Sequence, residues 1–515
     1  MPSKTRTDYS ILNILTGLGG YFINTLLGLI CRMVFTRTLA ADYLGINGLF
    51  GNILSMLSLA ELGIGTAIVY ALYKPLATDD RPQIASLVRF YGQCYRVIGV
   101  VVGIAGLCLM PFLNVLIREP PNISENLHVI YLLFLFNTAS TYFFSYRSSL
   151  LMAAQQNYLV TGLSYIVTIS QSIIQMVLLF LTHNYMLYLL VQTAGTLFYN
   201  VLISNIAKKR FPFIADKNIA PLEKNQRRSL IRNVRALTIT KVAGMMVNQT
   251  DNIIITYFSG LATTGYASNY TLLSGTLNSL LNQLFNGISA SVGNHNAIET
   301  KEHKLQLFYS INLANFWLFG WAAIGIFLVS NDLVALLFGK SFVLSLSISF
   351  VIALNFYMVG MQSAVWTYGN TMGLFRQGRY LLFLTAAINL ACSIWLGKCW
   401  GLFGILIATA ISRACTNTWY DPYKVFKYGF GEPARKYFKR YFEFAGLLVL
   451  CGGICYFLCS LCKFGLWGNV LVKFVICSFI PNSVFYLVFR KRPEFAYLEV
   501  LAKRVINKVF RRSVK

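Results

Sequence analysis

Charged side chains inside apolar stretches are the first candidates for chemistry in this 515-residue chain. An ionised side chain in hydrocarbon is costly, so such residues are kept where they pair, reach water or meet a ligand. Among the charged residues within stretches long enough to cross a bilayer, six cations and two acids are the candidates: Arg32, Arg89, Arg96, Arg235, Lys241 and Lys473, with Glu61 and Asp251. Pairing the two acids with two of the six cations leaves about four positive charges. The pattern predicts that water or an anionic ligand reaches these cations.

Depth separates the cations from one another. Arg96 and Lys241 lie about twelve and eleven residues inside their stretches, near the middle of the bilayer at about 1.5 Å per residue. Arg89 precedes Arg96 by two helical turns and shares its face. Arg32, Arg89 and Arg235 lie near the ends of their stretches, where a long side chain can also snorkel to water. Ligand and structural roles therefore stay open for these three arginines.

A phosphate-bearing ligand suits this set of cations. A guanidinium group binds two phosphate oxygens at once, and a lysine acts as a mobile point charge. We therefore predict a cationic, substrate-binding cavity formed by Arg32, Arg89, Arg96, Arg235 and Lys241. Lys473 is left out of the cavity because it belongs to the last two spans and can snorkel.

The two embedded acids have structural and coupling interpretations. Glu61, in LSLAELGIG (57–65), lies at a depth comparable with Arg96 and Lys241. It is predicted to be a counter-charge in a salt bridge to one of them, with proton coupling as the alternative. Asp251, in NQTDN (248–252), pairs with a neighbouring helix or serves an H⁺ or Na⁺ site. The sequence predicts no cofactor and no metal site, and it leaves the coupling ion open.

Polar side chains near these charges are candidates for contacting sugars. Their amide groups supply donors and acceptors, although each also suits a hydrogen bond between helices. The predicted polar lining consists of Asn248, Asn269 and Gln283.

Composition identifies the solvent in which these residues must be positioned. Hydrophobic residues make up 56% of the chain and charged residues only 12%, so we predict a multi-pass membrane protein. A span needs about 17–25 apolar residues. Such segments recur at 10–36, 43–72, 84–114, 125–150, 158–182, 184–206, 230–258, 264–292, 305–330, 343–370, 378–397, 401–420, 441–462 and 465–489. The fold class is predicted to be all-α with about 14 spans, since lipid satisfies no backbone groups and strand-like alternation is absent.

Positive charge predicts the orientation. With the N-terminus inside, the inner segments hold about 33 of the 44 Lys and Arg residues and the outer loops about five. Both termini are therefore predicted to be cytoplasmic. The net charge of +26 resembles that of a nucleic-acid-binding protein, but the basic clusters lie beside spans. Anionic membrane lipids are the predicted partner, and nucleic acid is not.

A weak repeat divides the spans into two lobes. At an offset of 222, residues 38–50 align with 260–272 and Asn47 meets Asn269. We predict the following parts: N-lobe 1–206 with spans 1–6, basic cytoplasmic linker 207–229, C-lobe 230–420 with spans 7–12, basic cytoplasmic loop 421–440, spans 13 and 14 at 441–489, and a basic cytoplasmic tail 490–515.

Motifs of several enzyme classes are missing. The chain has no GxxxxGK[ST], HExxH or GxSxG pattern and no sizeable segment outside the predicted spans. We therefore predict a transporter and no catalytic residues.

Cys451, Cys455, Cys459 and Cys462 share a helix face, which predicts a stripe that packs against another helix or faces lipid.

The region RMVFTRTLAADYLGINGLFGNILSMLSLAELGIG (32–65) and its continuation to residue 99 resemble bacterial polysaccharide flippases of the Wzx type. These proteins form a branch of the multidrug/oligosaccharidyl-lipid/polysaccharide exporter (MOP) superfamily. A looser resemblance continues through NQTDNIIITYFSG (248–260). It implies about 12 to 14 helices in two lobes around a central cavity that is often cationic.

The resemblance also implies an activity. Such a protein moves an undecaprenyl-pyrophosphate-linked oligosaccharide across the bacterial cytoplasmic membrane by alternating access, for capsule, exopolysaccharide or O-antigen synthesis. A polysaccharide polymerase and glycosyltransferases are then expected partners. Two alternatives remain: a drug or cation antiporter on the same fold, which predicts an acid-dominated cavity, and a membrane glycan polymerase or ligase, which needs a substantial external loop. The predicted outer loops reach only about ten residues.

Overall fold

The computed structural model describes most of the chain. The described residues are 6–58, 64–117, 121–216, 219–224, 226–228, 230–231, 234, 250–298, 300–372, 374, 378, 380–462 and 464–500. Over these ranges the chain forms helices and no strand, which confirms the all-α fold.

Nine helices within the described ranges are long and apolar enough to cross a membrane. Eight of these helices each match one predicted span, and the ninth, residues 381–430, covers two predicted spans, 378–397 and 401–420. The other four predicted spans run into parts of the chain that are not fully described. A multi-pass membrane protein is therefore supported, and the total of about 14 spans stays a prediction.

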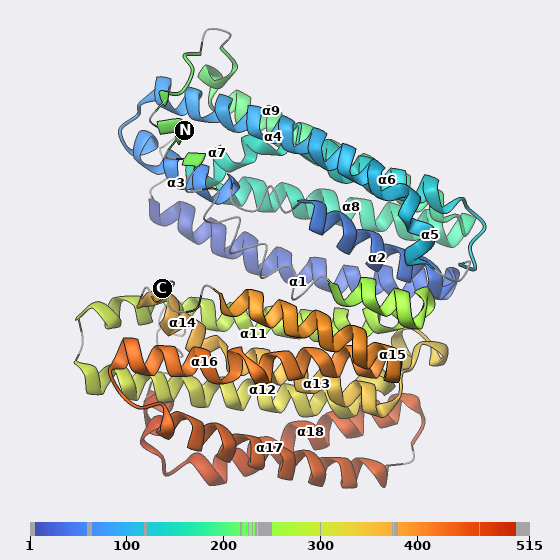
Figure 1. Ribbon diagram of the computed structural model, residues 1–515, viewed down its shortest axis with the longest axis vertical. Helices are drawn as coiled ribbons and strands as arrows, with labels where there is room; N and C mark the ends of the chain where they lie inside the picture. The colour runs from blue at the N-terminus through green and yellow to red at the C-terminus, as the bar shows by residue number, and fades with distance from the viewer. Residues whose placement is uncertain are drawn as a thin grey trace, which may run out of the picture. The chain divides into compact units, whose positions relative to one another are not determined.

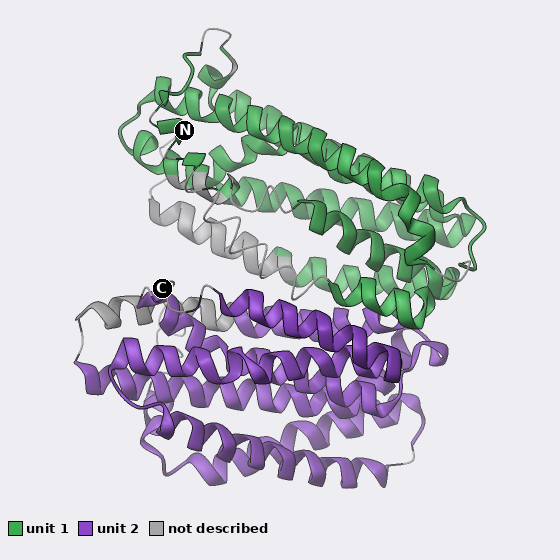
Figure 2. Cartoon of the chain, viewed as in Figure 1, with its two compact units in different colours: residues 1–265 green, residues 266–515 purple. Residues whose placement is uncertain are grey.

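The chain divides into two compact units, residues 1–265 and 266–515 (Figure 2). The sequence places the boundary between lobes in the linker 207–229. In the structure the described parts of that linker belong to unit 1, and the division falls inside the helix Leu261–Ile298.

Unit 1 consists of long helices joined by short turns (Figure 1). Its labelled helices are α1 (Arg6–Thr38), α2 (Ala41–Leu57), α3 (Ile64–Ala77), α4 (Arg81–Leu109), η2 (Met110–Phe112), α5 (Leu113–Leu116), α6 (Leu127–Thr141), η3 (Ser145–Arg147), α7 (Ser148–Ala153), α8 (Asn157–Thr182), α9 (Tyr185–Arg210) and η4 (Pro212–Ala215). Helix α8 packs against both α1 and α9, and α6 packs against α9.

Local capping sets several of these helix starts. The Asp80 side chain accepts a hydrogen bond from the Gln83 amide at the start of α4, and Asn184 accepts one from the Leu187 amide at the start of α9. Such side chains satisfy amide groups that a helix start leaves without partners.

Unit 2 is built around α12, which has buried side chains from Leu307 to Val334. Its labelled helices are α11 (Leu261–Ile298), α12 (Lys301–Leu337), η5 (Lys340–Phe342), α13 (Leu346–Met361), α14 (Ser363–Thr371), α15 (Leu381–Cys415), α16 (Asn417–Lys424), the π-helix η7 (Val425–Phe430), α17 (Arg435–Ser460) and α18 (Leu466–Phe489). Helix α12 contacts α13, α17 and α18. Phe316 of α12 stacks on Phe444 of α17 with ring centroids 4.4 Å apart.

Gly401 breaks α15 into two helical segments. Its backbone has φ 56° and ψ −134°, a conformation that only glycine adopts readily. The break lies where the sequence separates the spans 378–397 and 401–420. Farther along, residues 417–430 are helical although the sequence predicts a loop from residue 421.

The cysteine stripe of α17 faces protein. Cys451, Cys455 and Cys459 are buried, and Cys477 of α18 is buried with them in the core of unit 2. Cys462 is only half-buried. Of the two predicted alternatives for the stripe, the structure supports packing.

Candidate functional site

Helix α4 presents Arg89 and Arg96 on one exposed face. Tyr91 and Tyr95 are buried and anchor the helix within unit 1, which leaves both arginines outside that core. Seven residues separate Arg89 from Arg96, which is about 10 Å along the helix. This geometry agrees with the shared face that the sequence predicts and allows each guanidinium to take a phosphate group.

Arg89 already has a partner in the segment that the sequence predicts to be the basic linker, 207–229. Its Nη1 atom donates a hydrogen bond to the carbonyl oxygen of Ile219. Ser86 Oγ donates to the Ala220 carbonyl oxygen over 2.8 Å, and Gln83 Nε2 donates to Gln226 Oε1 over 2.6 Å. The predicted basic linker is therefore held on the N-terminal end of α4, and Arg89 fits a structural role in this conformation.

Arg32 lies half-buried in the second half of α1. Its charge interacts with Tyr188 of α9, beside Cys31. Phe35 lies one turn further along α1 and packs edge-on against the Tyr188 ring, with centroids 5.3 Å apart. Arg32 is thus fixed within the helix packing of unit 1, at a different place from Arg89 and Arg96.

The remaining predicted site residues are described to different extents. Asp251 is half-buried in the helical stretch 250–259. Asn269 of α11 is fully buried, which fits a hydrogen bond between helices. Gln283 lies in α11, and nothing is described of its side chain. Glu61, Arg235, Lys241 and Asn248 lie outside the described residues, so their predicted roles stay predictions.

Sequence reasoning missed two charged contacts because their partners are distant in the sequence or lie at a helix break. Lys473 Nζ of α18 forms an ion pair with Asp332 Oδ2 of α12 at 2.6 Å, and both side chains are about four-fifths buried. Arg147, at the break between α6 and α7, donates from Nη1 to Ser204 Oγ over 2.6 Å. The sequence does contain one signal for this contact, because Arg147 is a cation inside the span predicted at 125–150 and such a cation needs a partner.

A buried polar network forms a third feature that the sequence did not predict. Asp421 accepts hydrogen bonds from Trp366 Nε1 at 3.1 Å and Asn417 Nδ2 at 3.4 Å, and it pairs with Lys424 Nζ at 3.0 Å. Asn417 Oδ1 accepts a further bond from Thr385 Oγ1 at 2.7 Å. The network joins α14, α15 and α16, and it explains how the charged segment after residue 416 is buried as a helix.

The described residues hold no group of three or more His, Cys, Asp or Glu side chains placed to bind a metal ion. What they offer includes exposed positive charge on α4 and the ion pairs and hydrogen bonds described above. This chemistry suits binding of an anion more than bond making or breaking.

Comparisons of sequence place the chain in no family. No family model matches it, and no curated protein sequence matches it either.

Solved structures do share its fold. The lipid II flippase MurJ in an inward closed conformation superposes with a TM-score of 0.66 at 14% identity, over 93% of this chain and 100% of that chain. An inward-facing multidrug resistance MATE family transporter of the MOP superfamily has a TM-score of 0.59 at 12% identity, over 76% of this chain and 91% of that chain. A MOP superfamily transporter from Pyrococcus furiosus, described as having a binding pocket of reverse polarity, reaches 0.50 at 12% identity, over 82% and 97%. The chain therefore has the fold of MOP superfamily transporters.

Proposed function

We propose that this chain is a flippase for lipid-linked oligosaccharides carried on undecaprenyl pyrophosphate in the bacterial cytoplasmic membrane. One observation carries the proposal: the fold likeness to a lipid II flippase covers 93% of the chain, whereas the likeness to the multidrug transporter covers 76%. The excess of embedded cations over acids in the sequence supports an anionic substrate. A drug or cation antiporter on the same fold is the second candidate, because the multidrug transporter also shares the fold.

In the proposed cycle, a cavity open to the cytoplasm takes up the charged head of the substrate. Arg96 and Lys241 bind phosphate oxygens, and Glu61 balances one of these cations when the substrate is absent. Amide side chains such as Asn248 and Gln283 contact the sugars, while the prenyl chain stays in lipid. Movement of the two units, each a compact body, then exposes the sugars on the other side.

The proposed role of Arg96 is tested by Arg96→Ala and Arg96→Lys in a bacterial strain that depends on this chain. In Arg96→Ala, radiolabelled lipid-linked units should accumulate inside the cell. Surface polysaccharide should fall at least tenfold, because a lost phosphate contact that weakens substrate binding by about 1.4 kcal/mol lowers the affinity tenfold. Arg96→Lys should retain part of the activity because it keeps the charge.

Lys398→Ala supplies the matched control. Lys398 is an exposed cation beside the α15 break, so its loss changes the net charge equally without touching the proposed cavity. Normal surface polysaccharide from well-expressed Arg96→Ala would overturn the role of Arg96. Sensitivity to cationic dyes with unchanged surface glycan in a deletion strain would favour the antiporter.

A further inference from the structure

A cavity of about 1080 Å³ lined by charged and apolar side chains lies at the end of unit 2 where α12 and α17 begin. The charge distribution of the sequence predicts that this end is cytoplasmic. The walls of the cavity come from the first turns of both helices, from η7 and the turn after it, and from the segment following α18. The charged residues that line it are Glu302, Glu432, Arg435, Lys436, Lys439, Arg440 and Glu494.

Two of the three carboxylates in this cavity are already neutralised. Glu432 pairs with Lys301 at 2.8 Å, and Glu494 pairs with Arg440 at 2.6 Å. Arg440 is held further by the ring of Tyr309, whose centroid lies 4.1 Å from the guanidinium carbon. The cavity therefore contains more positive than negative charge once these pairs are removed.

Three exposed cations account for that excess. Arg435, Lys436 and Lys439 stand in the first two turns of α17, and only Glu302 remains to oppose them among the lining residues. The first turn of α17 contains no acid, and its N-cap residue Ala434 makes no side-chain hydrogen bond. Since the start of a helix carries partial positive charge, an anion supplied from outside would be favourable here.

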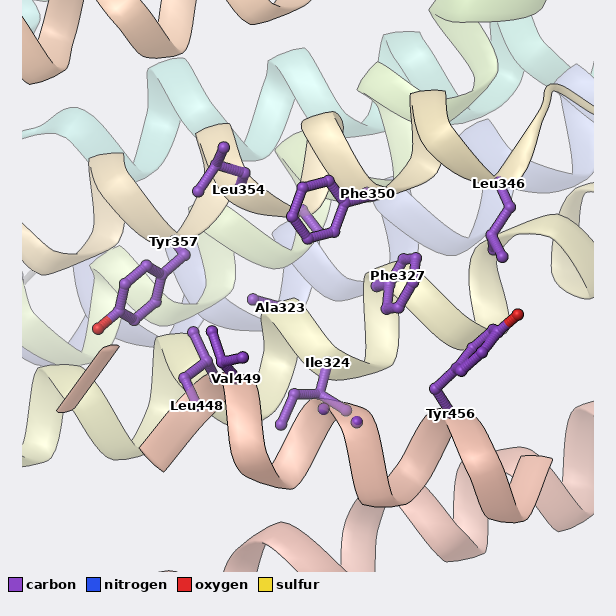
Figure 3. A pocket seen from close by; sticks show the side chains of 13 residues that line it. Ala323, Ile324, Phe327, Leu346, Phe350, Leu354, Tyr357, Leu448, Val449 and Tyr456 are labelled. Carbon is purple, nitrogen blue, oxygen red and sulfur yellow. The ribbon is translucent and has the colours of Figure 1, made fainter. Parts of the chain in front are cut away.

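An apolar groove lies deeper along the same helices. It has a volume of about 370 Å³ and is lined by α12, α13 and α17 (Figure 3). Tyr357 and Leu448 mark one end of it, and Leu346 and Tyr456 mark the other (Figure 3). Leu448 follows Arg440 by eight residues, about 12 Å along α17, which is within the roughly 15 Å of hydrocarbon in one leaflet.

Tyr357 lines the groove at the end nearer the start of α17 (Figure 3). Tyr357 is 4% exposed, and its hydroxyl has no hydrogen-bond partner among the described residues. It interacts electrostatically with Tyr437 and Tyr441 on the first turns of α17, which places it at the cavity end of the groove. A buried hydroxyl without a partner is costly, so an acceptor from a ligand would stabilise it.

We propose that α12, α13 and α17 form a binding site for an anionic phospholipid of the cytoplasmic leaflet. Its phosphate binds Arg435, Lys436 and Lys439 in the cavity, and one acyl chain enters the groove. An ester carbonyl of the lipid accepts the hydrogen bond of Tyr357. A prenyl pyrophosphate also joins an anion to an apolar chain, but it has no ester carbonyl at the depth of this hydroxyl.

The site lies wholly within unit 2 and does not depend on the transport proposal. Its test uses the purified full-length chain in detergent, titrated with phosphatidylglycerol or with phosphatidylcholine of the same acyl chains. Lipid adducts are counted by native mass spectrometry, and the thermal unfolding midpoint is followed. We expect phosphatidylglycerol to bind and raise the midpoint, and phosphatidylcholine to do neither.

Charge variants locate the headgroup. The triple variant Arg435→Gln, Lys436→Gln and Lys439→Gln should weaken phosphatidylglycerol binding about a hundredfold. Each cation near the membrane surface contributes roughly fivefold to the affinity for an anionic lipid, and three are removed. The triple variant Lys208→Gln, Lys209→Gln and Arg210→Gln removes the same charge at the end of α9 in unit 1 and should leave this binding unchanged. An equal loss in both triple variants would mean a general effect of charge and would overturn the site.

Two further variants locate the chain and the ester. Gly452 lines the groove and a Cβ atom there would have no neighbour within 4 Å, so Gly452→Leu should extend into the groove and weaken binding. Tyr357→Phe should reduce binding of ester-linked phosphatidylglycerol to the level that wild-type shows for its ether-linked analogue. Undecaprenyl phosphate binding in place of phosphatidylglycerol would assign the site to a prenyl lipid and overturn the proposal.

Discussion

At the scale of residues, the ion pair between Asp332 and Lys473 changes how the embedded charge is counted. The two residues are 141 positions apart in the sequence, and Asp332 lies just beyond the predicted end of the span 305–330. Sequence reasoning therefore treated Lys473 as a lysine that reaches water. Depth is readable from a sequence, but pairing across helices is not, because spacing along the chain carries no information about which helices touch.

We expect Asp332→Asn to destabilise unit 2. The substitution leaves Lys473 charged and largely buried, and loss of one partner from such a pair costs about 3 kcal/mol. The double variant Asp332→Asn with Lys473→Met removes both charges and should recover most of that loss. The thermal unfolding midpoint in detergent measures both effects, and an unchanged midpoint in Asp332→Asn would show that the ion pair contributes nothing.

The candidate cation site was predictable only in part. That Arg89 and Arg96 share a face follows from their spacing, and the structure places both on the exposed face of α4. The hydrogen bond from Arg89 to Ile219 was not predictable, since its acceptor is a backbone carbonyl 130 residues away. A backbone acceptor leaves no trace in side-chain patterns.

At the scale of elements, α2 and the start of α11 approach one another at two glycines. A Cβ atom at Gly45 would overlap the Leu261 carbonyl oxygen, and one at Gly265 would overlap the Ala41 carbonyl oxygen. Both obstacles are backbone atoms, which cannot move aside as a flexible side chain can. Residues 261–265, which open the second of the two stretches that align at an offset of 222, therefore pack against α2 within unit 1.

Gly45→Ala and Gly51→Ala in α2 should have opposite effects. The first forces the backbones apart and should cost about 1–3 kcal/mol or more. The second adds a methyl group where nothing lies within 4 Å, and removing a helical glycine there should stabilise the protein by about 0.5–1 kcal/mol. Size-exclusion profiles of heated samples report both, and similar profiles for the two variants would contradict the close approach.

Residues 417–430 are helical although their composition resembles that of a loop. The segment NTWYDPYKVFKYGF contains Asp421 and Pro422 together with Asn417, Thr418, Lys424 and Lys427, which is typical of a loop between spans. In the structure Asp421 pairs with Lys424, so the charges need not reach water, and Val425, Phe426 and Phe430 are buried in the core. Local composition cannot reveal that compensation.

At the scale of the whole molecule, fold class was the most predictable property. A chain with this hydrophobic content and no alternating pattern can satisfy its backbone in lipid only as helices. The sequence predicts a linker at 207–229 from its charge, whereas the compact units of the structure meet at residues 265 and 266. The structure instead assigns the described parts of that linker to unit 1 through contacts with α4.

Native cysteines offer a test of the predicted orientation. Cys399 beside the break in the middle of α15 and Cys415 at the C-terminal end of α15 are both exposed. With cytoplasmic termini, a membrane-impermeant maleimide added to intact cells should label Cys399 and spare Cys415, and inside-out vesicles should give the reverse. Peptide mass spectrometry identifies the labelled site without cysteine removal. Labelling of Cys415 in intact cells would invert the topology.

The close approach at Gly45 also has a consequence for the order of synthesis. Residues 261–265 belong to unit 1, so a nascent chain that ends at residue 230 lacks the segment that covers α2. Translation proceeds at about 5–20 residues per second, so roughly 2–7 seconds pass before residue 265 is made. During that interval the close contact at Gly45 cannot form, so this part of unit 1 is completed only after most of its helices have been synthesised.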